Sequence, residues 1–302
     1  MRNEERRRAS ISPIEVRPAE AGGIASRLAI CDDGTEMSPP KCSLSPSEEA
    51  LVALLLDAHR NRRLIDQVPA HLVPTEEASA YRVANAVSDR LGMDIGGWKI
   101  GATAANNLQE LGAARPIVGR VPRRNIVHSP AQLSYDSLMT PVQECEFAFE
   151  LAEDLERRPS GWTAAELVPK IRAMYPAIEV GERRLSRNST VPILLLIADN
   201  SAAGHLVLGA PVDHWQDHDI AQSAVSLRID DVDVAAGFGR DVLGHPLNAL
   251  AWLANQGDLA GRPLMEGDIV STGSCTGMKP VGRGSMSTAD FGPMGRVEVS
   301  FA

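Results

Sequence analysis

The sequence predicts an α+β fold, in which a helical N-terminal part packs on one β-rich catalytic part. Apolar residues recur at helical spacing within residues 45–95, whereas short apolar runs between Gly- and Pro-containing turns fill residues 96–302. The chain shows no internal repeat and no clear interdomain linker. We therefore expect residues 45–302 to form a single domain, preceded by a tail at residues 1–44.

The tail at residues 1–44 is predicted to be disordered. It consists largely of Arg, Glu, Ser, Pro and Gly without a sustained apolar period, so it cannot bury enough apolar surface to become ordered. It lacks the apolar segment of a secretory signal, and its interspersed glutamates argue against a transit peptide.

Composition narrows the class of function. The 302 residues are 44% hydrophobic and 23% charged, as in globular domains, and the net charge of -9 argues against nucleic acid and anionic membranes as partners. No apolar run reaches the roughly 18 residues of a membrane span. The four cysteines form no CxxC pair and no cluster with histidine. This pattern argues against zinc and disulfides and favours a reducing cytoplasm.

Two helices are expected in the N-terminal part. Ser45 and Glu48 have the spacing of a capping box, with Pro46 at the first helical position. A second helix is expected to begin at Thr75 and to end at Gly92. Beyond it we expect helices at residues 163–174 and 248–255, strands at 97–101, 143–151, 191–198, 268–273 and 295–301, and a hairpin at 225–234.

The strongest local signal for chemistry is the acidic strand at residues 143–151. Because successive side chains of a strand point to opposite faces, Glu144 and Glu146 share one face, while Cys145 and Phe147 share the other. One interpretation is a solvated acidic face. The other is a pocket with a hard cation, because two carboxylates about 7 Å apart along a strand repel each other without one. Mg²⁺ prefers oxygen ligands and retains water that a chelating substrate can replace.

Two further residues are candidates for the same site. Glu179 follows an apolar stretch, so it either supplies a third carboxylate near the core or pairs with a neighbouring arginine. Lys99 lies between Trp98 and Ile100, which are expected to face the core and to leave Lys99 on the opposite side. Only four of the 30 basic residues are lysines, and Lys99 is one of them. It either binds a substrate carboxylate or transfers a proton, or it is an ordinary surface lysine.

Two polar segments are weaker candidates. Asp199, Asn200 and Ser201 follow the strand expected at residues 191–198, where polar residues either line a site or form a turn. A glycine-rich loop carries Ser274 and Thr276, and loops of this kind hold carboxylates or phosphates. The loop matches neither a P-loop nor a dinucleotide-binding fingerprint.

Six segments, taken in order and spacing, resemble the 2-keto-4-pentenoate hydratase and 4-oxalocrotonate decarboxylase family, part of the fumarylacetoacetate hydrolase superfamily. The resemblance runs from about Ser47 to the C-terminus and leaves out the tail. The segments are Gly97-Trp98-Lys99-Ile100-Gly101, Glu144-x-Glu146, Pro176-Ala177-Ile178-Glu179, Ala198-Asp199-Asn200-Ser201, Gly244-His245-Pro246-Leu247 and Thr272-Gly273-Ser274.

The resemblance implies a mixed β-roll of the fumarylacetoacetate hydrolase C-terminal type with flanking helices. It also implies Mg²⁺ or Mn²⁺ as cofactor, a homo-oligomer, and a place in the breakdown of aromatic compounds. By motif position, Glu144, Glu146 and Glu179 match the metal-ligating glutamates, and Lys99 matches the active-site lysine.

The resemblance also assigns roles around the metal. The segment that matches a pocket lining makes Asp199 and Ser201 the expected catalytic partners of Lys99 and makes Asn200 an expected substrate contact. Ser274 and Thr276 of the glycine-rich loop are expected to contact the substrate as well.

The sequence departs from the family pattern at two places. The family usually carries Asp-Ser-Arg after the third glutamate, where this chain has Glu182-Arg183-Arg184, and Lys279 stands where many relatives carry no charge. Lys279 is therefore expected either to bind a second substrate carboxylate or to be exposed. Whether Glu150 or Glu182 joins the site stays open.

The function implied is a hydratase that adds water to a 2-hydroxy-2,4-dienoate and forms a 4-hydroxy-2-oxo acid. The alternatives are a decarboxylase of an oxalocrotonate-like 2-oxo dicarboxylate, a C–C hydrolase of an acylpyruvate, and an inactive homologue that binds an oxo acid.

Overall fold

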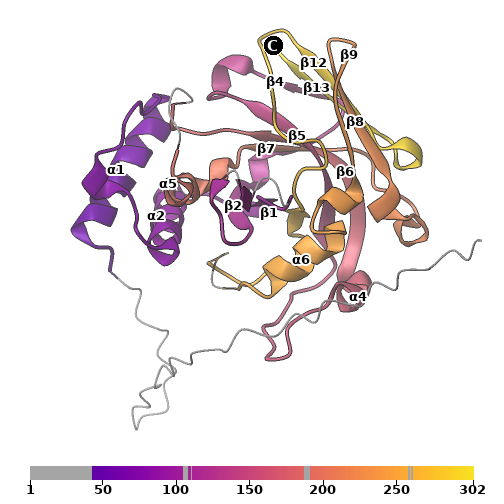
Figure 1. Ribbon diagram of the computed structural model, residues 1–302, viewed down its shortest axis with the longest axis horizontal. Coiled ribbons are helices and arrows are strands. Elements are labelled where there is room, and N and C mark those ends of the chain that lie inside the picture. The colour runs from indigo at the N-terminus through magenta and orange to yellow at the C-terminus, as the bar shows by residue number, and fades with distance from the viewer. Residues whose placement is uncertain (1–42, 105–107, 110, 187–190, 258, 260) are drawn as a thin grey trace, which may run out of the picture. The chain divides into compact units, whose positions relative to one another are not determined.

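The computed structural model describes residues 43–302 except 105–107, 110, 187–190, 258 and 260. Leu44–Ala302 form one compact unit, and the predicted tail lies outside the described residues except for its last two positions. Helix α1 (Pro46–Asn61) packs on α2 (Glu77–Arg90), which in turn packs on α5 (Ile193–Ala198) beside the strands (Figure 1). None of the described helices is both long and apolar enough to cross a membrane.

Two sheets make up the β-rich part. The larger has the order β2-β1-β10-β5-β6-β7-β3, with β11 also paired to β5, and the smaller has the order β4-β13-β12-β8-β9. Parallel and antiparallel pairs occur in both. The larger sheet comprises β1 (Ile95–Gly101), β2 (Ile117–Pro122), β3 (Ile126–His128), β5 (Val142–Leu151), β6 (Ile171–Gly181), β7 (His205–Leu208), β10 (Ile269–Ser271) and β11 (Lys279–Pro280). The smaller comprises β4 (Ala131–Leu133), β8 (Ala224–Ile229), β9 (Val232–Phe238), β12 (Met286–Asp290) and β13 (Arg296–Phe301).

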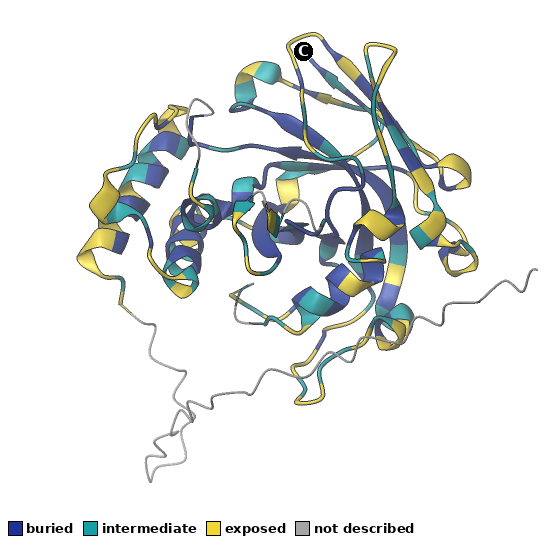
Figure 2. Ribbon diagram, in the orientation of Figure 1, coloured by how far each residue is buried: buried dark blue, intermediate teal, exposed yellow. Residues whose placement is uncertain are grey.

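Strands β5 and β6 are long, antiparallel and buried along most of their length (Figure 2). One face of β5 places Cys145, Phe147 and Phe149 in the main hydrophobic core, as the period-two pattern predicts. The opposite face places Ala148 in a small second cluster with Tyr175 and other residues of β6, β7 and β2. The same face carries the acidic residues, so the carboxylates lie beside a small apolar cluster.

Several predicted elements are confirmed. The capping box of α1 is present, because the Ser45 hydroxyl accepts from the Glu48 N–H and the Glu48 carboxylate accepts from the Ser45 N–H. The hairpin β8–β9 turns at Asp230 and Asp231, which both have positive φ. Helix α6 (Pro246–Ala254) and strands β1, β5, β10 and β13 overlap the ranges expected for them.

Three predictions about elements are wrong. The apolar run expected as a strand at residues 191–198 is the helix α5, which begins after Pro192. The helix expected at residues 163–174 is only the four-residue α4 (Ala164–Leu167) and one 3₁₀ turn, and β6 begins at Ile171. Pro169 lies where a longer helix would need a backbone N–H donor. Helix α2 starts at Glu77 rather than at Thr75, without a side-chain cap.

Candidate metal centre

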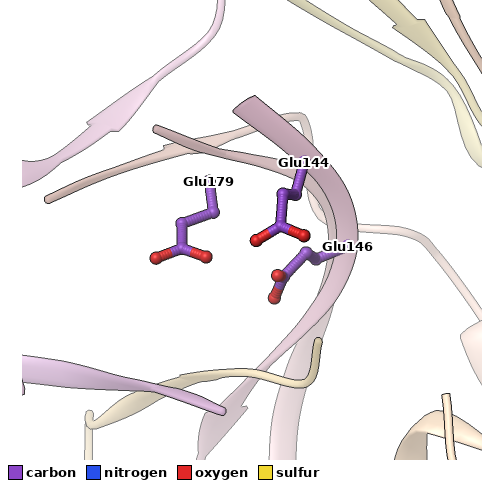
Figure 3. Close-up of side chains that lie close together, drawn as sticks. All are labelled: Glu144, Glu146 and Glu179. Atoms are coloured by element: carbon purple, nitrogen blue, oxygen red, sulfur yellow. The ribbon is translucent and has the colours of Figure 1, made fainter. Parts of the chain in front are cut away.

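Three glutamates from two neighbouring strands meet on one face of the larger sheet. Glu144 and Glu146 lie on β5, and Glu179 lies on β6 directly opposite Glu144 in the ladder. One carboxylate oxygen from each lies within 4.8 Å of the others, and Figure 3 shows the three groups gathered in one place. Glu144 and Glu179, which are 35 positions apart in the sequence, meet because the antiparallel register pairs them.

Burial of these acids makes their charges costly. Glu146 and Glu179 are each only 1% exposed, and Glu144 is half-buried. Burial, reinforced by the neighbouring carboxylates, raises the pKa of Glu146 well above its usual range. Burial likewise raises the pKa of Glu179 to about 7, although the charge of Lys99 opposes it. The cluster is thus short of positive charge.

Lys99 supplies part of that charge. Its Nζ lies 3.5 Å from Glu179 Oε1, and only 6% of the residue is exposed. Trp98 and Ile100 are fully buried in the core on the other side of β1, as expected. Burial acts to lower the pKa of Lys99, but the three glutamates outweigh it and raise that pKa. Lys99 is therefore an ammonium that faces the carboxylates.

The hydrogen bonds of the cluster leave room for a cation. Glu146 Oε2 accepts from Ser271 Oγ at 2.5 Å and from the Gly273 N–H at 2.8 Å. Glu146 Oε1 and Glu179 Oε2 are buried and accept no hydrogen bond from the described residues, and Glu179 Oε1 has only the Lys99 ammonium, at 3.5 Å. Orphaned carboxylate oxygens in an oxygen-only cluster fit a hard divalent cation such as Mg²⁺ or Mn²⁺. Ser271 was not predicted as a site residue; the only hint is a hydroxyl at the end of an apolar strand.

Asp199, Asn200 and Ser201 have their side chains engaged elsewhere. The Asp199 carboxylate accepts from Arg184 Nε at 2.6 Å and from the Arg184 N–H at 2.7 Å. The Asn200 amide bonds both the N–H and the carbonyl of Arg120 on β2, and Ser201 Oγ donates to the Val118 carbonyl. None of these bonds reaches the carboxylate cluster, so the segment braces β2, the neighbour of the strand that carries Lys99.

The residues predicted in the C-terminal part lie around the cluster rather than in it. Ser274 Oγ accepts from the Thr276 N–H within the loop, and Thr276 Oγ1 accepts from the Cys145 N–H, which ties the loop to β5. Lys279 pairs with Gln143 across the β11–β5 ladder. Paired residues share a face, which places Lys279 on the side of the sheet away from Glu144.

Glu150 and Glu182, whose membership of the site the sequence did not decide, interact with other partners. Glu150 accepts from Tyr175 Oη at 2.7 Å and pairs with Arg172 at 3.0 Å. Glu182 accepts from the Met139 N–H at 2.9 Å and lies 3.4 Å from His205 Nδ1. The cluster of close carboxylates therefore consists of Glu144, Glu146 and Glu179.

Comparison with known proteins places these residues in a family. Residues 102–302 match the family model described as fumarylacetoacetate (FAA) hydrolase, C-terminal. The chain is 32% identical over 252 residues to the TodF product hydratase of Pseudomonas putida, covering 82% of this chain and 93% of that protein. It is 32% identical over 260 residues to 2-keto-4-pentenoate hydratase 1 of Dechloromonas aromatica, covering 85% and 97%.

Solved structures share the fold. The 4-oxalocrotonate decarboxylase from Pseudomonas putida G7, complexed with magnesium and adipate, superposes with a TM-score of 0.78 at 24% identity. The match covers 86% of this chain and 99% of the decarboxylase chain. The arrangement of mixed sheets with flanking helices is thus that of the fumarylacetoacetate hydrolase fold.

Proposed function

Because the chain belongs to the fumarylacetoacetate hydrolase family, we propose that it is a metal-dependent hydratase. It adds water to a 2-hydroxy-2,4-dienoate and releases a 4-hydroxy-2-oxo acid. The observation that carries the proposal is the buried group of three glutamates with orphaned oxygens, faced by one lysine ammonium. The names of the hydratases that resemble this chain over most of its length support the choice of reaction.

The cofactor proposed is Mg²⁺ or Mn²⁺, held by Glu144, Glu146 and Glu179. When bound, such an ion supplies Lewis acidity and neutralises negative charge that develops on a substrate oxygen. The donor set consists only of carboxylate oxygens, which suits these ions better than zinc or copper.

For 2-hydroxypenta-2,4-dienoate the chemistry needs two proton movements and one water. Loss of the enol proton with protonation at C5 gives a 2-oxo-3-enoate, and water then adds its oxygen to C4 and a hydrogen to C3. Lys99 is proposed to hold the anionic carboxylate or enolate of the substrate, because its ammonium lies beside the carboxylates that would bind the ion. Ser271 and the Gly273 N–H hold Glu146 in place.

The decay of the dienoate absorbance in the ultraviolet tests the proposal. We expect decay with purified protein and Mg²⁺, loss of decay with EDTA, and a loss of about 100-fold in Glu146→Gln. Glu150→Gln is the matched control, since Glu150 lies on the same face of β5 but bonds Tyr175 and Arg172 instead. Metal-independent decay, or equal loss in both variants, would refute the assignment.

Decarboxylation of an oxalocrotonate-like 2-oxo dicarboxylate is the second candidate, favoured by the fold match to 4-oxalocrotonate decarboxylase. Release of CO₂ from such a substrate, without decay of the pentadienoate, would replace the hydratase assignment by this one. The same pair of assays separates both reactions from hydrolysis of an acylpyruvate, which forms pyruvate, and from a homologue that binds an oxo acid without turnover.

We further propose that the enzyme works in the cytoplasm as a homo-oligomer. The two cysteines within the described residues, Cys145 and Cys275, are buried free thiols, as expected in a reducing compartment. Light scattering coupled to size-exclusion chromatography measures the oligomer, and a monomeric mass at micromolar concentration would refute it.

A further inference from the structure

The two oxygens of Glu146 have different surroundings. Oε2 accepts two hydrogen bonds, from Ser271 Oγ at 2.5 Å and from the Gly273 N–H at 2.8 Å. Oε1 is buried and accepts none from the described residues. The carboxylate, shown with its two neighbours in Figure 3, thus offers one free oxygen to a cation and keeps the other bound to the protein.

The position of Ser271 is fixed by the sheet. It is the last residue of β10, where it pairs with Lys99 of β1 on one side and with Ala148 of β5 on the other. The residue is fully buried. Next to it, Thr272 donates from both its N–H and its hydroxyl to the Phe147 carbonyl, which anchors the end of the strand.

The second donor is fixed by the absence of a side chain. Gly273 has a φ of +108°, and a Cβ at this position would lie 2.0 Å from Thr103 Oγ1. Only glycine tolerates both this backbone conformation and this close approach. The Gly273 N–H is therefore held toward Glu146 by packing that no other residue permits.

We propose that Ser271, together with the Gly273 N–H, restricts Glu146 to one-oxygen coordination and so sets the preference of the site for a small six-coordinate cation over Ca²⁺. Ca²⁺ takes six to eight oxygen ligands, often with both oxygens of a carboxylate, whereas Mg²⁺ requires near-octahedral geometry at about 2.0–2.1 Å. Two-oxygen binding by Glu146 would cost both of its hydrogen bonds, and bonds to a charged acceptor are among the stronger ones. Ser271 is thus a specificity-determining residue of the metal site.

The competing explanation is that Ser271 only stabilises a buried carboxylate. In that case removal of the Ser271 hydroxyl weakens the binding of every divalent ion by the same factor, because Glu146 is less well placed for all of them. Selectivity between two ions, rather than affinity for one, separates the two roles. The inference rests on the proposed metal site but concerns which ion the site selects.

Calorimetric titration of the full-length, metal-free protein with MgCl₂ and with CaCl₂ tests the inference. In Ser271→Ala we expect Mg²⁺ to bind about tenfold more weakly, at the lower end of the effect of losing such a partner. We expect the affinity for Ca²⁺ to fall by less, or to rise, so that the ratio of the Ca²⁺ Kd to the Mg²⁺ Kd falls. Ser88→Ala, which removes another buried hydroxyl, one that donates to the Ala84 carbonyl within α2, should leave the ratio unchanged.

Two variants of nearly equal size, Ser271→Thr and Ser271→Val, separate loss of the hydroxyl from a general effect on folding. Thr keeps the hydroxyl donor and Val removes it, and both are favourable strand residues. Ser271→Thr should retain the preference and Ser271→Val should lose it. An equal change for both ions in the Ala and Val variants would overturn the inference while leaving the hydratase proposal intact. A shift in the Kd ratio, combined with no dienoate turnover by the wild-type protein, would support the inference and refute the hydratase reaction. Absence of ion binding to the wild-type protein would overturn both.

Discussion

Asp199 and Arg184 form a buried ion pair that braces the edge of the β-roll. Arg184 donates three hydrogen bonds to Asp199, two to its carboxylate and one, from Nη2, to its carbonyl. Both residues are at most 4% exposed. Asn200 and Ser201, which follow Asp199, bond the backbone of β2, so the ion pair acts on β2 through them.

Replacement of Asp199 by Ala is expected to destabilise the protein by about 3–5 kcal/mol, because it leaves the Arg184 charge buried and unpaired. Burial raises the pKa of Asp199, and the charge of Arg184 only partly offsets this. Removal of one partner is therefore costly, although the net contribution of the intact pair to the free energy of unfolding is small because both charges are buried. Urea unfolding followed by circular dichroism measures the change.

Asp94→Ala is the control, because that side chain is 77% exposed and its pairing with Arg123 spans 3.4 Å. Its free energy of unfolding should change by less than about 0.5 kcal/mol. If Asp199→Ala kept wild-type stability and lost only activity, the bracing role would be wrong and the catalytic role expected from the family resemblance would stand.

Lys99→Met is expected to separate metal binding from turnover. The Lys99 ammonium lies 3.5 Å from Glu179 Oε1 and opposes a second cation in the cluster. Its loss should therefore tighten Mg²⁺ binding several-fold, while dienoate turnover falls by about 100-fold or more, the usual effect of losing such a group. Calorimetry and the ultraviolet assay give the two quantities.

Lys170→Met serves as the control for Lys99→Met, since Lys170 pairs with Glu153 away from the cluster. It should leave both the Mg²⁺ Kd and turnover unchanged. Weaker metal binding in Lys99→Met would show that the lysine supports the cation rather than opposing it.

Divalent metal should stabilise the folded protein. The buried carboxylates repel one another, and an ion that binds only the folded state adds about 2.7 kcal/mol at 100 times its Kd. We expect Mg²⁺ to raise the Tm of the wild-type protein and EDTA to reverse the rise, as followed by differential scanning fluorimetry. Glu146→Gln should show little rise, and an equal rise in that variant would place the ion elsewhere.

The stability contribution of Glu48 should depend on pH. Burial acts to raise the pKa of this residue, but hydrogen bonds from Ser45, Ser79 and Arg82 prevail and lower it from 4.5 to about 2. Because the folded pKa lies below the unfolded one, the contribution is fully present above about pH 4.5 and is lost as pH falls toward 2. The stabilisation by Glu48 is therefore linked to the ionisation of its carboxyl group.

Urea unfolding of Glu48→Gln and wild type at pH 7 and at pH 4 measures this dependence. The difference in free energy of unfolding should be largest at pH 7 and smaller at pH 4. Glu76→Gln, at the exposed start of α2 where no side-chain cap bond forms, should show no such trend. A difference independent of pH would mean that Glu48 acts through packing rather than through its charge.

Local patterns in the sequence were sufficient for the capping box of α1, the two faces of β5, and the placement of Lys99 opposite Trp98 and Ile100. Each of these follows from hydrogen bonds or side-chain directions within a few residues, and such features show in the sequence as a fixed spacing or an alternation of residue types. The resemblance of motifs then pointed to Glu144, Glu146 and Glu179 as one group, and the structure brings their carboxylates together.

Tertiary contacts decided the rest. The apolar run before Asp199 has no period that separates a buried strand from a buried helix, and packing against α2 made it α5. Ser271 meets Glu146 across 125 residues of sequence, and Asp199 meets Arg184 through a bond that a turn signal does not reveal. Strand register and the burial of charge determine such partners. The sequence alone therefore predicted the three glutamates of the site, whereas only the folded sheet determined which groups form hydrogen bonds with the buried acids.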